Sequence, residues 1–362
     1  MATRTQSRAL IDVADLDDIA IGGAILGTGG GGDPYIGKLM AQQAIRRHGP
    51  VRMIDVEDLA DDALIAACAM MGAPTVMLEK IPQGDEIVIA FGKLEKFLGR
   101  KIDAALCAEA GGLNSTTPFI VAAAAGLPVI DGDGMGRAFP ELQMVTFTMH
   151  GLPATPMVAC DDKGNSILLE TIDNKWTERL ARSATIEMGG SALIALFSMS
   201  GAVAKRAVVR GTLTIARRLG ALLRESKVSH VDPVAAIQSE LGAATLFRGR
   251  VQDIARRTVG GFARGEAKFA GVDDCAGHAY RIEFQNEFLI AERDGTPIAT
   301  TPDLITLLDV DTGAPITTET LRFGLRVVAI AIPCAPQWRT PEGLALVGPA
   351  YFGYAAEYRP FD

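Results

Sequence analysis

The sequence contains few histidines and cysteines, and none of them falls in a common metal-binding spacing. Its 362 residues include four histidines and five cysteines. The cysteines are far apart, odd in number and form no CxxC pair, which argues against a disulfide framework and against a thiolate zinc site. No HxH or HExxH spacing occurs. Cys68 and Cys107 lie in apolar runs, so we expect buried and inert thiols there.

Long apolar runs are also missing. No stretch of about 18 residues is apolar without polar breaks, so no membrane-spanning helix is expected. The first residues, MATRTQSRALIDVADL, lack the continuous apolar segment of a signal peptide. We therefore expect a cytoplasmic protein without a membrane partner.

Basic residues are outnumbered by acidic ones. The chain has 35 Lys and Arg against 43 Asp and Glu, a net charge of −8. Its basic clusters are short and lie in apolar-patterned stretches, so no nucleic-acid partner is expected. Hydrophobic residues make up 48%, enough for two cores, and the length suggests about two domains. Apolar segments such as 192–203, which we predict to be helical, favour a homo-oligomer.

Strand-like and helix-like segments alternate in the first half of the chain. This alternation predicts a three-layer α/β/α domain over residues 1–172, with a mostly parallel sheet between two layers of helices. A hairpin is expected over 155–171, around the turn Asp161-Asp162-Lys163-Gly164-Asn165. The predicted strands are 51–54, 63–71, 103–109 and 127–131, and the predicted helices are 15–26, 34–48, 84–99, 114–126 and 137–146.

The pattern changes in the second half, residues 173–362. Residues 173–240 are predicted to be mainly helical, with helices over 173–188 and 212–226 and a third capped by Asp232-Pro233. Short strands separated by turns over 243–335 predict an antiparallel β-barrel-like domain. The predicted fold class is therefore α/β followed by β. The predicted strands are 244–256, 261–270, 279–285, 287–293, 297–301, 315–322 and 325–332.

The densest glycine segment is GTGGGGDP at residues 27–34. The segment before it has helical spacing, whereas a dinucleotide-binding site needs a strand there. The string GDPYIGKL matches a P-loop through Lys38, but Leu39 replaces the hydroxyl residue that binds magnesium. No nucleotide cofactor is therefore expected. Asp33 and Pro34 are predicted to start a helix as N-cap and first helical residue.

Successive glycines turn several backbone N–H groups toward one point, and a helix N-terminus adds partial positive charge. We therefore predict that Gly29, Gly30, Gly31 and Gly32 bind an anion or a carbonyl oxygen that becomes anionic during reaction. A tight turn between helices, in which only glycine fits, is the alternative. Asp33, at the end of this loop, is a candidate catalytic carboxylate.

Polar residues follow the predicted strands of the first half. Because ligands bind beyond the carboxyl ends of the strands in open α/β sheets, Glu109, Asn114, Asp131 and Asp133 are expected to converge. Carboxylates there suit a general base that acts on water. Together with His150, Asp131 and Asp133 also suit zinc or another divalent metal. The alternatives are ordinary: Asp131 caps a turn, His150 is a turn residue, and Glu141 pairs with Arg137 at helical spacing.

Several longer strings resemble the S-methyl-thiohydantoin desulfurase family. They are GTGGGGDPYIGK (27–38), AMMGAPTVMLEK (69–80), EAGGLNS (109–115), DGDGMGRAFPELQM (131–144), RIEFQNEFLIA (281–291) and WRTPEGLALVGPAYFGY (338–354). The family was long catalogued as a domain of unknown function, and its members are described as hydantoinase or oxoprolinase associated. The resemblance implies a three-layer α/β domain followed by a β-barrel-like domain. It also implies hydrolysis of a five-membered cyclic amide or thioamide, in which water replaces a methylthio group and leaves methanethiol and a hydantoin.

Under this resemblance we assign roles by chemistry. Glu109, Asp133 or both would activate water, with or without zinc held by His150. Amides of the glycine loop would stabilise negative charge, and Asn114 would bind a ring amide. Lys80 would supply a cation, or instead pair with Glu79 on the surface. The second half would close the site with Glu283, Asn286 and Glu287.

Two other functions remain open at this stage. One is a non-catalytic or accessory partner of a hydantoinase- or oxoprolinase-type enzyme. The other is a small-molecule-binding module that uses the glycine loop without a general base.

Overall fold

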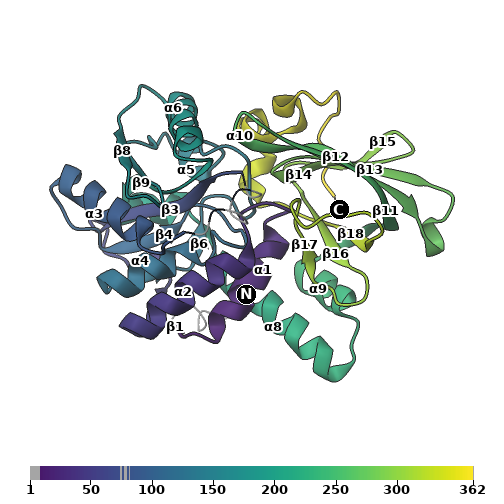
Figure 1. Cartoon of the computed structure of the whole chain (residues 1–362), viewed down its shortest axis with the longest axis horizontal. Helices are drawn as coiled ribbons and strands as arrows, with labels where there is room; N and C mark the ends of the chain where they lie inside the picture. The colour runs from purple at the N-terminus through teal and green to yellow at the C-terminus, as the bar shows by residue number, and fades with distance from the viewer. Residues whose placement is uncertain (1–8, 74–75, 77–79, 81, 362) are drawn as a thin grey trace.

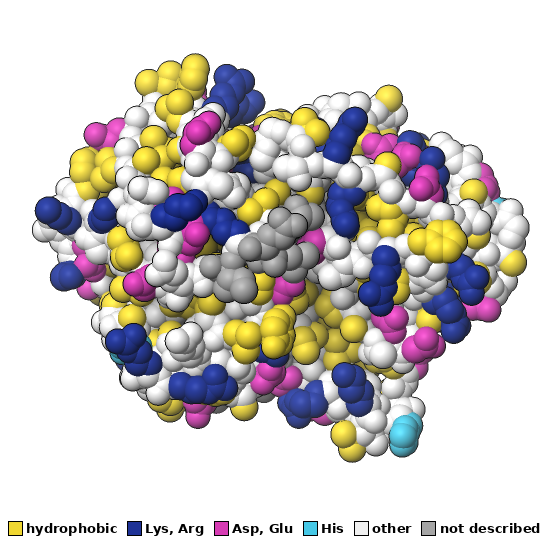
Figure 2. All heavy atoms as spheres, in the orientation of Figure 1, with side chains coloured by type: hydrophobic (Ala, Val, Ile, Leu, Met, Phe, Trp, Pro, Cys, Tyr) yellow, Lys and Arg dark blue, Asp and Glu magenta, His cyan; other side chains and the backbone are white. Residues whose placement is uncertain are grey.

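The computed structural model describes residues 9–73, 76, 80 and 82–361, which form two eight-stranded sheets. Figure 1 shows the first sheet and its helices on the left and the second sheet on the right. On the face shown in Figure 2, basic and acidic side chains are interspersed. None of the helices in the described ranges is long and apolar enough to cross a membrane.

The first sheet is mixed rather than mostly parallel. Its strands run in the order β1-β2-β5-β4-β3-β9-β7-β8. Only the central four, β2, β5, β4 and β3, are parallel to one another, and β9 pairs with β3 in the antiparallel sense. The bounds are β1 Ala9–Ile11, β2 Val51–Ile54, β3 Leu64–Gly72, β4 Ala104–Cys107, β5 Val129–Ile130, β7 Met157–Cys160, β8 Ser166–Leu169 and β9 Ser191–Ser200. The predicted hairpin over 155–171 is confirmed as β7 and β8.

Helices cover both faces of this sheet. Alternate residues of β3 belong to different cores: Ala66 and Cys68 pack with α2, α3 and α4, whereas Ile65 and Ala67 pack on the side of α6. This division follows from the period of two in a strand. It confirms the layered α/β arrangement. The helix bounds are α2 Pro34–His48, α3 Glu86–Leu98, α4 Thr117–Ala125 and α6 Asn174–Glu187.

Two predicted helices are absent from the structure. Residues 137–146 form no helix: the chain is irregular around Pro140, and only α5 (Thr146–Met149) is helical. Residues 192–203 are not a helix either, because β9 takes up 191–200 and only then does α7 (Gly201–Ala207) begin. A continuous apolar run fits a buried strand as well as a buried helix, and here it fills the centre of a sheet.

The remaining middle segment packs largely against the first half. Helix α8 (Thr212–Ser229) lies along α1 (Asp15–Leu26), as Figure 1 shows. The approach is close, because a Cβ on Gly22 would lie 1.7 Å from the Ala216 carbonyl oxygen. Helix α9 (Pro233–Leu241) follows, and the Asp232 side chain accepts hydrogen bonds at its start as predicted. A short ribbon of β6 (Gly132–Asp133) and β10 (Val209–Arg210) also ties this segment to the first half.

The second sheet is antiparallel, in the order β15-β14-β13-β12-β11-β18-β16-β17. The predicted barrel-like closure is not seen: across the described part of the chain, β15 and β17 are edges that do not pair with each other. Strand β16 was not predicted, and only Pro315–Ile316 of the predicted strand 315–322 is extended and paired. The bounds are β11 Ala244–Val259, β12 Phe262–Gly271, β13 Ala279–Gln285, β14 Glu287–Arg293, β15 Thr296–Thr300, β16 Leu304–Asp309, β17 Pro315–Ile316 and β18 Arg326–Ile332, with α10 at Pro341–Val347.

Candidate active site

A cavity lies where the carboxyl ends of β3 and β4 meet the glycine loop and the turn between β13 and β14. It encloses about 570 Å³ of space, part of it open to solvent. Both sheets contribute to its wall, so the site exists only when the two halves are together. The wall includes Gly31, Gly32, Ala69–Gly72, Glu109, Asn114, Met135, Phe139–Leu142, Arg182, Ile194, Leu196, Phe197, Asn286 and Glu287.

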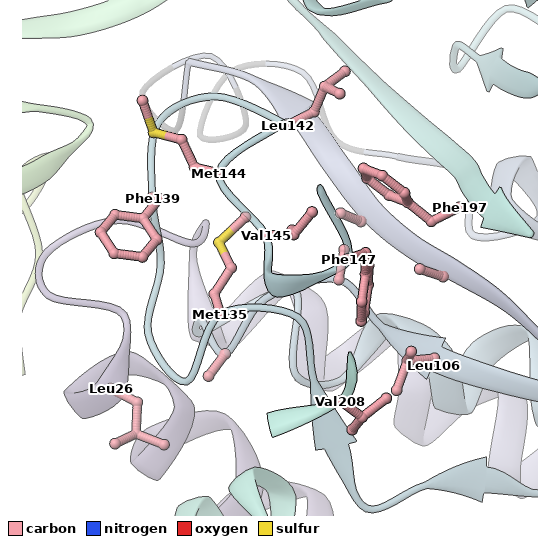
Figure 3. Close-up of a cluster of buried hydrophobic side chains, with 14 of the residues drawn as sticks. Leu26, Leu106, Met135, Phe139, Leu142, Met144, Val145, Phe147, Phe197 and Val208 are labelled. Carbon is pink, nitrogen blue, oxygen red and sulfur yellow. The ribbon is translucent and has the colours of Figure 1, made fainter. Parts of the chain in front are cut away.

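One side of the cavity is apolar and rich in sulfur. Figure 3 shows Met135, Phe139 and Leu142 on the irregular segment after β6, in one cluster with Phe197 of β9. The Trp338 indole N–H donates to the Met135 carbonyl oxygen at 2.7 Å, and the Trp338 ring meets Phe139 edge-on at 5.1 Å. This wall is therefore fixed in place. Polarizable thioethers and aromatic rings favour a small apolar or sulfur-containing group.

Two carboxyl groups from the first half line the cavity, Glu109 and Glu141. Glu141 is half-buried and accepts from the Tyr351 hydroxyl at 2.7 Å, whereas Glu109 is the buried one. It follows β4 and is 8% exposed. The Asn114 side-chain amide donates to its Oε1, and the Phe139 backbone N–H donates to its Oε2 at 3.3 Å. The Asn114 side-chain oxygen Oδ1 accepts from the Met70 N–H at 2.7 Å, which fixes the amide relative to β3. Burial, above all, raises the pKa of Glu109 to about 8, so this carboxyl exchanges protons near neutral pH.

The glycine loop binds to three distant segments through its carbonyl oxygens. Thr28 accepts from the Phe288 N–H, Gly29 from the Thr318 N–H, and Gly31 from the N–H of Leu113. Thr28 has a φ of 50° and Gly31 a φ of 75°, so the backbone turns repeatedly through the left-handed region. No described residue accepts a hydrogen bond from the N–H of Gly31 or Gly32. Both glycines line the cavity, so these two donors are available to a bound molecule.

The second sheet contributes the turn between β13 and β14. Asn286 has a φ of 61°, and its side-chain oxygen accepts from the Ala263 N–H at 2.8 Å. The next residue, Glu287, is 2% exposed, and burial raises the pKa of its carboxyl well above the ordinary range. A Cβ on Gly30 would lie 1.9 Å from Glu287 Oε1, so the glycine loop and this side chain are in direct contact.

A fully buried cation lies beside the two carboxyl groups. Arg137 donates to the carbonyl oxygens of Ala138, Pro302, Asp303 and Phe288 and to the Thr28 hydroxyl. Its guanidinium lies 4.5 Å from the centre of the Phe139 ring. Because all these acceptors are neutral, its charge acts through space on Glu109 and Glu287, and it lowers the pKa of both.

Asp131 and Asp133, which were predicted to bind a metal or to be catalytic, accept hydrogen bonds mainly from backbone N–H groups. Asp133 is fully buried and accepts from the N–H groups of Ala110 at 2.6 Å and Gly136 at 2.9 Å, and burial raises its pKa to about 7. Asp131 accepts from the N–H and hydroxyl of Thr214, near the start of α8. Neither residue lines the cavity.

The predicted metal set does not fit a metal ion. His150 is exposed, and its backbone N–H donates to carbonyl oxygens at the C-terminal end of α5. Asp131 and Asp133, by contrast, are buried among backbone donors. Within the ranges that the structure describes, no three His, Cys, Asp or Glu residues are grouped so that they could hold a metal. We therefore route no chemical step through a metal.

The other predicted site residues lie apart from the cavity wall. Asp33 is the N-cap of α2 and accepts from the N–H of Tyr35 at 2.7 Å. Lys80 donates to the carbonyl oxygens of Met188 and Ser191 and pairs with Asp162 at 2.7 Å, while Glu79 lies outside the described residues. Glu283 forms an ion pair with Arg281 at 3.0 Å on β13. By contrast, Asn114 and Asn286 line the cavity together with Gly31 and Gly32.

Comparison with known proteins identifies the family. Residues 14–171 match the S-Me-THD-like N-terminal domain and residues 172–361 match the S-Me-THD-like C-terminal domain. The chain belongs to the S-methyl-thiohydantoin desulfurase family. The family name implies an enzyme that acts on a thiohydantoin.

A solved structure of a protein from Chromobacterium violaceum is similar to this chain over nearly the full length of both proteins. The two chains are 26% identical, with a TM-score of 0.79, and the similarity covers 98% of this chain and 100% of the other. No curated protein matches the chain.

Sequence reasoning missed part of the site. Arg137 was expected to pair with Glu141 on a helix, and the wall formed by Met135, Phe139 and Phe197 was not foreseen. No local signal marks these residues, because the segment after β6 has no regular period and its contacts come from the distant second sheet. Glu287 was expected to close the site together with Glu283 and Asn286, and the structure places Glu287 and Asn286, but not Glu283, in the cavity wall.

Proposed function

We propose that this protein hydrolyses the C–S bond of an S-methyl-thiohydantoin-like ring and releases methanethiol and a hydantoin. The observation that carries the proposal is the buried Glu109 carboxyl, fixed by Asn114 in the wall of a thioether-lined cavity. Family membership supports the same chemistry. The lining by Met70, Met71 and Met135 together with Phe139 and Phe197 suits a small ring that carries a methylthio group.

Glu109 is assigned as the general base. In its ionised form it removes a proton from water while the water oxygen bonds to the ring carbon that carries sulfur. Because burial raises the pKa of Glu109 to about 8, the carboxylate is a stronger base than an exposed glutamate. As pH rises toward 8, the ionised fraction grows, and the rate should grow with it.

The glycine loop is assigned to the charge that develops on the ring. Addition of water pushes electrons onto the ring nitrogen and its neighbouring carbonyl oxygen. Gly31 and Gly32 line the cavity, and their N–H groups have no acceptor among the described residues, which supports assigning them to that charge. The leaving methylthio group then fits the wall that contains Met135 and Phe197.

The test is a methanethiol-release assay on the purified chain with S-methyl-thiohydantoin. We expect turnover by the wild type and a loss of about 100-fold or more for Glu109→Gln, because the amide cannot take a proton from water. Glu57→Gln, a surface change at a residue whose side chain is 50% exposed, is the matched control and should keep full activity.

A chain that releases no methanethiol alone, but does so with a hydantoinase-type partner, would be an accessory protein and would contradict the proposal. Full activity of Glu109→Gln would remove Glu109 from the mechanism. Thermal unfolding of each variant checks that activity is compared between folded proteins.

A further inference from the structure

The Glu287 carboxyl is buried in the cavity wall without a complete set of hydrogen bonds. Its residue is 2% exposed, and among the described residues its Oε2 has no hydrogen-bond partner. Burial of an unpartnered carboxylate is costly, whereas the protonated acid is tolerated far better. A proton on this group is therefore favoured by the site itself.

The Glu287 side chain is held in place by its backbone. The Asn286 N–H donates to the Ala263 carbonyl oxygen at 2.7 Å, and the Asn286 carbonyl oxygen accepts from the Thr318 hydroxyl at 2.9 Å. On the other side, the Phe288 N–H donates to Thr28 of the glycine loop at 2.7 Å. The turn is thus fixed on both sides of Glu287, which is what an accurately placed reacting group requires.

Glu109 and Glu287 come from different sheets but line the same cavity. They are close enough for the charge of Glu109 to raise the pKa of Glu287. Arg137 provides one positive charge near both. Arg182 also lines the cavity and lowers the pKa of Glu287, but it is already paired with Glu178. Arg137 is therefore the cation that Glu109 and Glu287 share, and one shared cation beside two buried carboxyl groups favours a state in which one is ionised and the other holds a proton.

We propose that Glu287 is the catalytic acid that protonates the departing sulfur, in the reaction proposed above, on which this inference rests. Water adds to the ring carbon as Glu109 takes one of its protons, and the C=N electron pair moves to nitrogen. When the C=N bond forms again, the C–S bond breaks and the Glu287 proton passes to sulfur. Methanethiol leaves, the ring hydroxyl tautomerises to the hydantoin carbonyl, and the proton on Glu109 returns to Glu287.

The experiment compares S-methyl- and S-trifluoroethyl-thiohydantoin, whose leaving thiols differ in basicity, and each variant is referred to the wild type on the same substrate so that the larger size of the trifluoroethyl group cancels. The less basic trifluoroethanethiolate departs without help from an acid. We expect Glu287→Gln to lose about 100- to 1000-fold in kcat/KM on the methyl substrate and less than about 10-fold on the trifluoroethyl substrate. Glu109→Gln should lose the same factor on both, because the base acts on water in each case.

The pH profile gives a second readout. The wild-type rate on the methyl substrate should fall at alkaline pH as Glu287 loses its proton, and Glu287→Gln should lack this fall. Glu292→Gln, the same change on the same strand at a residue bonded to Arg281, is the control and should match the wild type on both substrates.

The outcomes separate the two proposals. Equal losses on both substrates, or an unchanged alkaline fall, would overturn the acid role of Glu287 and leave the function intact. A wild type inactive on both substrates would overturn the function itself. Thermal unfolding identifies a variant that is inactive because it is unfolded, and in that case Glu287→Asp, which keeps the acid, provides the second comparison on the same two substrates.

Discussion

Gly30 decides where the Glu287 side chain lies. Any side chain at position 30 would occupy the space of the Glu287 carboxyl, since a Cβ there would be 1.9 Å from Oε1. Glycine is required at position 31 for a different reason: its φ is 75°, a backbone conformation that is strained for other residues. The glycine run therefore combines close approach with left-handed turns.

Gly30→Ala should displace Glu287 and slow the reaction. A displacement of about 1 Å at a reacting group commonly costs about 100-fold in rate, and overpacking costs about 1–3 kcal/mol of stability. Methanethiol release and urea unfolding measure the two effects. The control is Gly92→Ala on α3, where no neighbouring atom lies within 4 Å: it should raise stability by up to about 1 kcal/mol at unchanged activity. Wild-type activity in Gly30→Ala would show that Glu287 need not stay where it is.

Sequence patterns that span a few residues predicted the roles of those residues whose partners are close in sequence. Asp33 caps α2 as expected, because an N-cap needs only the next three residues. Glu109 and Asn114 also meet in the cavity, since both follow the same strand. Asp131 was misjudged because its partner, Thr214, lies on a helix far along the chain.

At the level of secondary structure, the strand β9 shows why some elements escaped prediction. The run SALIALFSMS is apolar from Ala192 to Phe197 without alternation, and only its place between β3 and β7 makes it a strand. Helices with polar and apolar faces, such as α3 and α6, were predicted to within two residues at each end. Periodicity reveals elements that lie on a surface, whereas fully buried ones lack it.

The packing of α1 on α8 supports the glycine loop, which follows α1 directly. Gly22→Ala would place a methyl group 1.7 Å from the Ala216 carbonyl oxygen and push the two helices apart. We expect a loss of about 2–3 kcal/mol in the free energy of unfolding, measured in urea, together with lower activity. Unchanged stability would mean that α8 shifts freely, contrary to the close contact described here.

For the whole molecule, the layers of the first half were predictable but the position of the cavity between the sheets was not. Alternating strands and helices fix the layered domain, and the strand ends indicate one edge of a site. Which loop of the second sheet meets that edge depends on the docking of two cores. The prediction of a closed barrel was wrong for a related reason: closure depends on where the edge strands β15 and β17 lie relative to each other, which their sequences do not specify.

Buried acids should make the protein less stable as pH rises. Burial raises the pKa of Glu109 to about 8, of Asp133 and Glu319 to about 7, and of Glu287 well above its ordinary range. The folded chain therefore binds more protons than the unfolded chain between about pH 4 and pH 8, so the free energy of unfolding falls across this window. Urea unfolding at pH 5, 6, 7 and 8 tests this, and Glu109→Gln should flatten the slope. A free energy that rises with pH would contradict it.

The contact between Gly30 and Glu287 also has a consequence for the time at which the protein becomes active. During synthesis the glycine loop and the strands β2 to β5 emerge long before β13 and β14 exist. Until then, the cavity wall lacks Asn286 and Glu287. Under the proposed mechanism, docking of the second sheet completes the wall and adds the catalytic acid in one event. A newly made chain is therefore expected to become active only after almost all of it has been synthesised.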